Sequence, residues 1–234
     1  MKNPETSGVS GLAARLHKEC LPAQAWKALD KIKWVAAGNG AILAGGTAMA
    51  LQLGHRISRD LVFFTKKSFR PDKLISEIKK ATGDLQVVVE EEGTLILEIE
   101  GVKVSFFEYE YPFTVKIVEH AETRIAGILD IASTKVIAIS QRGVKRDFVD
   151  LYFILREVPF HLISAHMVKR FGKERINPLH IGKSLVWFAD ADTNPDPAYI
   201  KNKEVAWDAV KKFFRAHVKQ FTLDLEAAKD LETA

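Results

Sequence analysis

The sequence predicts an α+β fold, in which a mixed β-sheet core with helices is followed by a C-terminal helical bundle. Short β-prone runs separated by glycine turns fill the first half of the chain, and helical periodicity extends from residue 128 almost to the end. We therefore expect a core domain over residues 1–126 and a helical domain over residues 127–234. With 234 residues and 47% hydrophobic content, the chain is long enough to bury one sizeable core or a medium domain with a helical appendage.

The composition excludes several classes of protein. The sequence has no run of about 18 uncharged apolar residues and no apolar segment of the signal-peptide type near Met1, so we expect a cytoplasmic protein with no membrane partner. The single cysteine, Cys20, excludes an intrachain disulfide and a multi-cysteine metal site. A net charge of +4 and a pI near 9.0 are compatible with anionic partners but do not require them.

The first elements form a helix, a strand and a sharp turn. Residues 18–37 place apolar side chains at helical spacing, which predicts a helix that packs on the sheet. The apolar run 41–44 predicts a buried strand, and Gly45 and Gly46 then turn the chain. Because glycine has no Cβ, this turn can take positive φ angles and let a ligand phosphate approach the backbone closely.

A helix and a second strand are expected to follow this turn. Thr47 is placed to cap a helix over residues 48–53, whose N-terminus would suit a triphosphate. Asp60 opens the β-prone run 61–64, which would return the chain beside the first strand.

A helix and three strands complete the expected core. Pro71 is typical of a helix start, and Gly83 ends that helix. The runs 85–90, 94–100 and 102–108 are separated by glycine turns and predict an antiparallel meander.

The second half predicts helices over residues 145–156, 160–171, 178–189 and 203–220, with a surface loop over residues 190–197. The four tryptophans lie in helical patterns, and we expect them to be packing anchors; they are Trp26, Trp34, Trp187 and Trp207.

The glycine turn and the strand after it resemble the nucleotidyltransferase superfamily motif, in which Gly-Gly precedes a strand that carries two carboxylates. The segments 45–48, 53–61 and 63–65 are most similar to the first block of the AbiEii/AbiGii toxin family within that superfamily. A second block, with Lys135 and the segment 142–152, resembles the downstream part of the same family. The resemblance covers roughly residues 40–156.

This resemblance implies a magnesium-dependent nucleotidyl transfer. Two Mg²⁺ ions held by carboxylates neutralise the charge that builds on the attacking and leaving oxygens. Asp60 matches the first carboxylate, but Val62 and Ser105 stand where a second and a third are expected. The substitutes that we consider are Glu98, Glu100 and Glu108, which equally fit the solvent side of strands.

The resemblance also implies roles for residues of both blocks. Gly45, Gly46 and Thr47 would hold the triphosphate, with Arg56 on a phosphate and Asp60 on the metal. Lys135, Asp147 and Asp150 are the matching positions in the second block. Lys135 would bind phosphate as a point charge, and Asp147 would orient or deprotonate the acceptor or ligate metal. Alternatively, residues 145–147 are simply a charged helix start.

The predicted function is transfer of a nucleotide from an NTP to an RNA or protein acceptor, by the toxin of a toxin–antitoxin pair. The implied partners are an NTP, an antitoxin protein and tRNA or another nucleic acid, docked on basic groups that could equally be solvated helix faces. The alternative is a catalytically degenerate nucleotide-binding or interaction module, because Val62 and Ser105 replace expected carboxylates.

Overall fold

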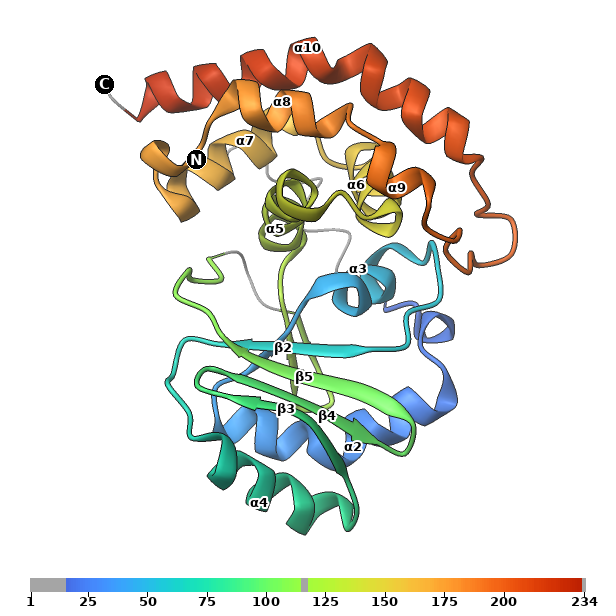
Figure 1. Ribbon diagram of the computed structural model, residues 1–234, viewed down its shortest axis with the longest axis vertical. Helices are drawn as coiled ribbons and strands as arrows, with labels where there is room; N and C mark the ends of the chain where they lie inside the picture. Colours follow the sequence, from blue (N-terminus) through green and yellow to red (C-terminus); the bar gives the residue numbers. More distant parts are fainter. Residues whose placement is uncertain (1–15, 115–117, 233–234) are drawn as a thin grey trace, which may run out of the picture. The chain divides into compact units, whose positions relative to one another are not determined.

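The computed structural model describes residues 16–114 and 118–232. These residues form two compact units, one over His17–Gly127 and a helical one that begins at Ile128. The first unit contains a seven-stranded sheet and the second contains helices, which confirms the predicted α+β class (Figure 1).

The sheet of the first unit has the strand order β3-β4-β5-β2-β1-β7-β6. Strands β2 and β5 run parallel, as do β1 and β7, and the other neighbouring pairs are antiparallel. The strands are β1 (Ile42–Leu43), β2 (Leu61–Thr65), β3 (Gln86–Glu91), β4 (Thr94–Ile99), β5 (Val102–Glu108), β6 (Val118–His120) and β7 (Thr123–Ile125).

The expected meander and the return of β2 beside β1 are both confirmed. Strands β3, β4 and β5 are antiparallel neighbours, and Ile42 and Leu43 pair with Phe64 and Phe63. Strands β6 and β7 were not expected. Each has only three residues, which is too short for the alternation that identifies a strand in a sequence.

Helices α2 (Ala23–Gly38) and α4 (Pro71–Thr82) lie side by side and pack on the sheet (Figure 1). The helix expected over residues 18–37 is confirmed from Ala23 onward. Residues Lys18–Cys20 form a separate 3₁₀ turn, η2, because Pro22 is the N-cap of α2. Pro71 starts α4 and Gly83 ends it, as predicted.

The helical unit is built around the long helix α10, which packs on α6, α7 and α8, while α5 packs on the same three helices (Figure 1). The expected loop over 190–197 begins instead inside a short helix, and the last helix starts later and ends later than predicted. The helices are α5 (Ile128–Arg142), α6 (Lys145–Leu155), α7 (Phe160–Phe171), η3 (Lys173–Arg175), α8 (Pro178–Leu185), α9 (Ala189–Asp192) and α10 (Trp207–Leu231).

An aromatic cluster forms the core of this unit. Phe148 of α6 lies 5.5 Å, between ring centroids, from Phe214 of α10 and 5.2 Å from Phe188. Phe160 and Phe221 stack at 4.3 Å. Such ring pairs stabilise a core beyond the area that they bury, so these contacts join α6 and α7 to α10.

Two of the four tryptophans are not packing anchors. Trp34 is 63% exposed and Trp187 is 64% exposed, which corrects the expectation for both. Trp34 lies on the exposed side of α2, and the helical pattern gives the spacing of apolar residues but not the width of the buried face. Trp187 lies outside any helix, because α8 ends at Leu185 and not at residue 189 as predicted.

Within the described residues, no helix has the length and apolar character needed to cross a membrane.

Cys20 provides a direct measure of how the first unit opens. The thiol is buried, and burial, with a smaller effect from the charge of Glu19, raises its pKa from 9.0 to about 11. At pH 8 about one thiol in a thousand is then ionised in the folded protein, against about one in ten when the chain is unfolded.

We therefore expect iodoacetamide to label the native protein at least about 100-fold more slowly at pH 8 than the protein unfolded in urea. Mass spectrometry over time gives both rates, and the single cysteine limits the product to one adduct. Equal rates in the two states would contradict the burial of this thiol.

Candidate active site

The turn between β1 and helix α3 (Gly45–Leu53) depends on a glycine at its first position. Ala44 is extended, and Gly45 takes a φ of 65°, in the left-handed region. A methyl group added to Gly45 would lie no closer than 3.7 Å to its neighbours, so the backbone conformation is the constraint there, not space. The helix starts directly at this turn, with no side chain bonded to its N-cap position.

Gly46 is required for a different reason. A methyl group at this position would lie 2.4 Å from Nη2 of Arg56. The guanidinium of Arg56 therefore occupies the space beside Gly46, and its Nη1 donates a hydrogen bond to the carbonyl of Ile57 at 3.1 Å. Arg56 and the glycine turn, each expected to bind phosphate, thus lie together in one unit. Arg56 places a cation beside the N-terminus of α3.

Thr47 does not cap α3, contrary to the sequence-based expectation, because the helix begins two residues earlier, at Gly45. Its hydroxyl is buried, donates to the carbonyl oxygen of Asp60 and lies 2.8 Å from the Ser58 hydroxyl. Thr47 therefore joins the first turn of α3 to the residue that precedes β2. Ser58 is a contact that the sequence reasoning missed.

The Asp60 side chain is half-buried and has no hydrogen bond or ion pair to any residue within 16–114 or 118–232. Its backbone is held by Thr47, while the carboxylate is available to a ligand. This is the arrangement expected of a residue that binds substrate or metal.

The strand register places side by side the two positions at which the resemblance implies further carboxylates. Val62 pairs with Ser105 across the parallel strands β2 and β5. A methyl group on Gly45 would lie 3.7 Å from Cβ of Val62, so Val62 borders the glycine turn. Neither side chain is a carboxylate, so neither position supplies the metal ligand that the resemblance implies.

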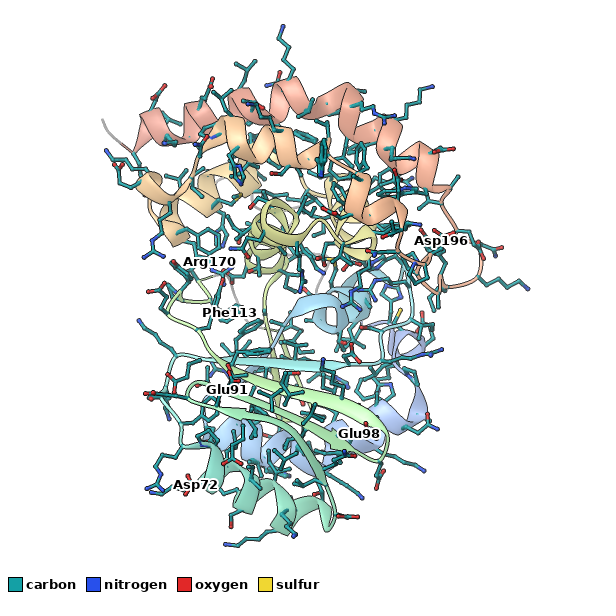
Figure 2. All side chains as sticks on the ribbon, viewed as in Figure 1. Asp72, Glu91, Glu98, Phe113, Arg170 and Asp196 are labelled. Carbon is teal, nitrogen blue, oxygen red and sulfur yellow. The ribbon has the colours of Figure 1, made fainter. Side chains whose placement is uncertain are left out.

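The three substitute glutamates lie elsewhere in the unit. Glu108 is at the other end of β5, level with Thr65, where it accepts hydrogen bonds from Ser68 Oγ at 2.7 Å and Phe69 N at 2.9 Å. Glu100 forms an ion pair with Lys31. Glu98 is exposed on β4, two strands from β2 and hence about 10 Å away (Figure 2).

These donors limit what metal the unit can hold. No group of three or more metal-binding side chains occurs among the described residues. Mg²⁺ is commonly held by one or two carboxylates together with substrate phosphates and water. Asp60 fits a single ion of that kind, but the side chains near it do not fit a pair of protein-held ions.

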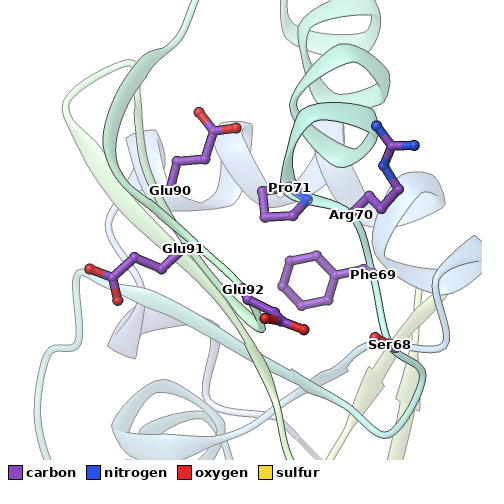
Figure 3. Close-up of a pocket in the computed structure, with 7 residues that line it drawn as sticks. All are labelled: Ser68, Phe69, Arg70, Pro71, Glu90, Glu91 and Glu92. Carbon is purple, nitrogen blue, oxygen red and sulfur yellow. The ribbon is translucent and has the colours of Figure 1, made fainter.

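A pocket of about 490 Å³ at the other end of β2 is not suited to a triphosphate. Figure 3 shows its lining, which consists of residues 68–71 and the three consecutive glutamates 90–92. These carboxylates would repel phosphate. The pocket also lies beyond Thr65, the last residue of the strand that Asp60 precedes.

The second unit brings the predicted residues Lys135, Asp147 and Asp150 together. Nζ of Lys135 on α5 lies 2.5 Å from Oδ1 of Asp147 and 2.7 Å from Oδ2 of Asp150, both on α6. Both carboxylates are fully buried and the lysine is 7% exposed. This spacing of three residues places both carboxylates on one side of α6, facing one ammonium group.

Arg142 completes this cluster and was missed as a site residue. Its Nε and Nη2 donate to Oδ2 of Asp147 at 3.1 and 3.0 Å, while its side chain is 57% exposed. Asp147 is thus bound by a cation on each oxygen. The signal was available in the sequence, because Arg142 opens the same segment as Asp147, but nothing in the spacing showed that the two side chains meet across Gly143.

Comparisons with known proteins agree with this geometry. Residues 27–126 match the family model described as "Nucleotidyl transferase AbiEii toxin, Type IV TA system". An uncharacterised protein of Aquifex aeolicus (strain VF5) is 36% identical over 203 residues, which cover 83% of this chain and 94% of that protein. The family match contains the glycine turn, Arg56 and Asp60, and ends before Lys135.

Two solved structures share the fold. MenT4, a nucleotidyltransferase toxin of Mycobacterium tuberculosis H37Rv, superposes with a TM-score of 0.54 at 17% identity, over 94% of this chain and 98% of MenT4. JHP933 of Helicobacter pylori gives a TM-score of 0.51 at 17% identity, over 91% and 98% of the two chains.

The glycine turn and Asp60 both lie inside the matched segment, and residues 27–126 are a domain of the AbiEii family of nucleotidyltransferase toxins.

Proposed function

We propose that this protein transfers a nucleotidyl group from an NTP to a hydroxyl of an RNA or protein acceptor, and that it acts as the toxin of a toxin–antitoxin pair. One observation carries the proposal. The N-terminus of α3 and the Arg56 guanidinium lie at the β1–α3 turn, and Thr47 in the first turn of α3 bonds to the backbone of Asp60 in the same unit.

The reaction is an in-line substitution at the α-phosphate. The acceptor oxygen forms a bond to phosphorus, the bond to the bridging oxygen breaks, and pyrophosphate leaves. In this proposal the backbone N–H groups that start α3 bind the phosphates, and Arg56 balances their charge. Gly45 and Gly46 let both groups approach, because a side chain at either position would strain the turn or displace the guanidinium.

Asp60 would hold one Mg²⁺ together with the phosphates of the NTP. When bound, that ion neutralises charge on the triphosphate and withdraws electrons from phosphorus. Thr47 acts indirectly, because its hydroxyl bond to the Asp60 carbonyl fixes the backbone from which the carboxylate projects.

We assign Lys135 and Arg142 to the same reaction as cations that stabilise phosphate charge. Asp147 and Asp150 are positioning residues in this assignment, because their buried carboxylates hold the two cations. Asp150 is thereby a nucleotide-binding residue only through Lys135. We further propose that residues 1–126 are the catalytic core and residues 127–234 a helical domain, and that tRNA or another nucleic acid and an antitoxin protein are partners.

The role of Asp60 is tested by removing its charge. Asp60→Asn should reduce label transfer from α-labelled NTP to bulk tRNA or protein on the order of 100-fold or more, because a metal-bound charge is worth several kcal/mol. The melting temperature should stay close to wild type, since the carboxylate has no partner among the described residues.

Glu98→Gln is the matched control. It removes an exposed carboxylate from the same sheet, two strands from β2, and should leave transfer unchanged. Equal transfer by wild type and Asp60→Asn would overturn the assignment of Asp60.

The two glycines should respond differently to alanine. Gly45→Ala forces a side chain into a left-handed backbone and should cost about 1–2 kcal/mol of unfolding free energy in urea denaturation. Gly46→Ala instead displaces the Arg56 guanidinium, which is buried and bonded to the Ile57 carbonyl, so it should weaken NTP binding in addition to any loss of stability.

A double-mutant cycle isolates this effect. If Gly46→Ala acts through the guanidinium, adding it to Arg56→Ala should change the dissociation constant for NTP no further. Additive losses would show that Gly46 serves the ligand directly and not through Arg56.

The buried cluster of Lys135, Asp147 and Asp150 gives a further prediction. Lys135→Ala leaves two buried carboxylates poorly compensated and should cost about 3–5 kcal/mol of stability. Arg142→Gln should cost no more than about 1 kcal/mol, because that side chain is mostly exposed, yet it should reduce transfer.

A triple substitution separates catalysis from folding. Lys135→Met with Asp147→Asn and Asp150→Asn removes the three buried charges together and should recover much of the stability lost in Lys135→Ala. We expect this variant to remain inactive. Full activity in it would show that the cluster is structural only.

Val62 and Ser105 favour one other candidate function, a nucleotide-binding module without transferase activity. Calorimetry of NTP binding with and without Mg²⁺ tests it. Binding that is independent of Mg²⁺, with no label transfer to any acceptor, would favour the module over the enzyme.

A further inference from the structure

The helical unit has a polar pocket that shares only Arg142 with the proposed chemistry. It has a volume of about 270 Å³ and lies between the C-terminal end of α5 and helices α8 and α9. Its lining includes Arg142, His180, Lys183, Trp187 and Asp190. All of these residues belong to the unit that begins at Ile128.

Trp187 presents an unusually exposed ring at this pocket. Its side chain is 64% exposed, and within the described chain no aromatic ring stacks on it. The next residue, Phe188, is 5% exposed and packs in the aromatic core, 5.2 Å from Phe148 and 5.7 Å from Trp207. The backbone of Trp187 is therefore anchored by its neighbour, while its indole is held toward solvent.

The charges around the indole are mainly positive. The side chains of His180 and Lys183 are exposed, and in the described part of the chain neither forms an ion pair. Arg142 adds a second positive charge beside Lys183, because its guanidinium reaches Asp147 with Nε and Nη2 and is otherwise largely exposed. Asp190 is the one carboxylate of the lining, so the pocket has an excess of cations.

An exposed indole beside cations is the combination that binds unpaired nucleotides. Bases stack on aromatic rings without needing a particular sequence, and Lys or Arg contacts the adjacent phosphate. The pocket is smaller than the range of about 300–1,000 Å³ that encloses a drug-sized ligand, so it suits a single base and not a complete nucleoside triphosphate.

We propose that this pocket binds one unstacked nucleotide of single-stranded RNA, with the base on Trp187 and the phosphate on Lys183 and Arg142. The inference rests on the proposed function and specifies its acceptor as RNA. Arg142 connects this pocket with the buried Lys135–Asp147–Asp150 cluster. The guanidinium that would contact the RNA phosphate is held by Asp147, which also holds Lys135.

The structure offers a matched control for Trp187. Trp34, on α2 of the other unit, is 63% exposed, which is almost the same fraction, but it lines none of the described pockets. Any effect of simply removing an exposed indole should therefore be equal at the two positions.

Binding is measured by the fluorescence anisotropy of a labelled five-nucleotide oligouridylate, without NTP. Trp187→Ala should weaken binding roughly 5- to 150-fold, the value of one base–aromatic stack, while Trp34→Ala should leave it unchanged. Trp187→Phe, which retains a ring, should recover part of the loss. Equal affinities of the Trp187→Ala and Trp34→Ala variants would overturn the proposal.

The salt dependence tests the phosphate contact. Lys183→Gln should reduce the slope of log K against log salt by about 0.7, the value for one phosphate of a single strand. Lys201→Gln, an exposed lysine of the same unit outside this pocket, should leave the slope unchanged. An unchanged slope in Lys183→Gln would contradict the assigned phosphate contact.

Competition identifies the ligand. Unlabelled oligouridylate should displace the labelled strand, and an RNA duplex or free UTP should do so much more weakly. Displacement by UTP as effective as by the oligonucleotide would assign the pocket to free nucleotides and overturn the proposal.

The binding assay tests this inference, and the transfer assay tests the proposed function separately. Asp60→Asn should bind the oligonucleotide like wild type while losing transfer. RNA binding that depends on Trp187 in a protein without transferase activity would support this inference and contradict the proposed function. Normal transfer, together with RNA binding that does not depend on Trp187, would support the proposed function and contradict this inference.

Discussion

The hydrogen bond from the Thr47 hydroxyl to the Asp60 carbonyl is the contact on which the site of the first unit depends. It ties the first turn of α3 to the residue before β2, and the Ser58 hydroxyl, 2.8 Å away, supports it. Because this contact is buried, losing it would leave polar atoms without partners inside the unit. The glycine turn and the Asp60 carboxylate are therefore held on one rigid frame, although 14 positions separate Thr47 from the strand that starts at Leu61.

In the helical unit the two carboxylates and the Lys135 ammonium are buried together, and Arg142 is the exposed cation of the cluster. Two buried aspartates are costly to desolvate, and Lys135 between them compensates part of that cost. A pair of this kind is weak evidence for stability, since apolar side chains of similar volume would often stabilise the fold as well or better. We therefore explain the buried aspartates by their effect on position: they hold Lys135 and the mostly exposed Arg142 in fixed places.

The sequence was informative where the signal is local. The β3-β4-β5 meander and the ends of α4 follow from glycine, proline and alternating apolar residues. Three features were not predictable in this way. Strands β6 and β7 are too short for periodicity, the role of Thr47 depends on a contact 13 positions away, and the exposure of Trp187 depends on Phe188 filling the core in its place. In each case the structure depends on contacts between distant residues, which a local sequence pattern does not contain.

The single carboxylate near the glycine turn changes how charge on the triphosphate must be balanced. A site with two protein-held ions needs several carboxylates in one place, but Val62 is apolar and Ser105 is neutral. The chain still contains a compact set of aspartates, Asp147 and Asp150, but they bind a lysine and an arginine. Arg and Lys side chains stabilise developing phosphate charge as metal ions do, and they need no open coordination positions. In the proposed reaction, we therefore expect transfer by this chain to depend strongly on Lys135 and Arg142, and less steeply on Mg²⁺ concentration than a reaction with two protein-held ions.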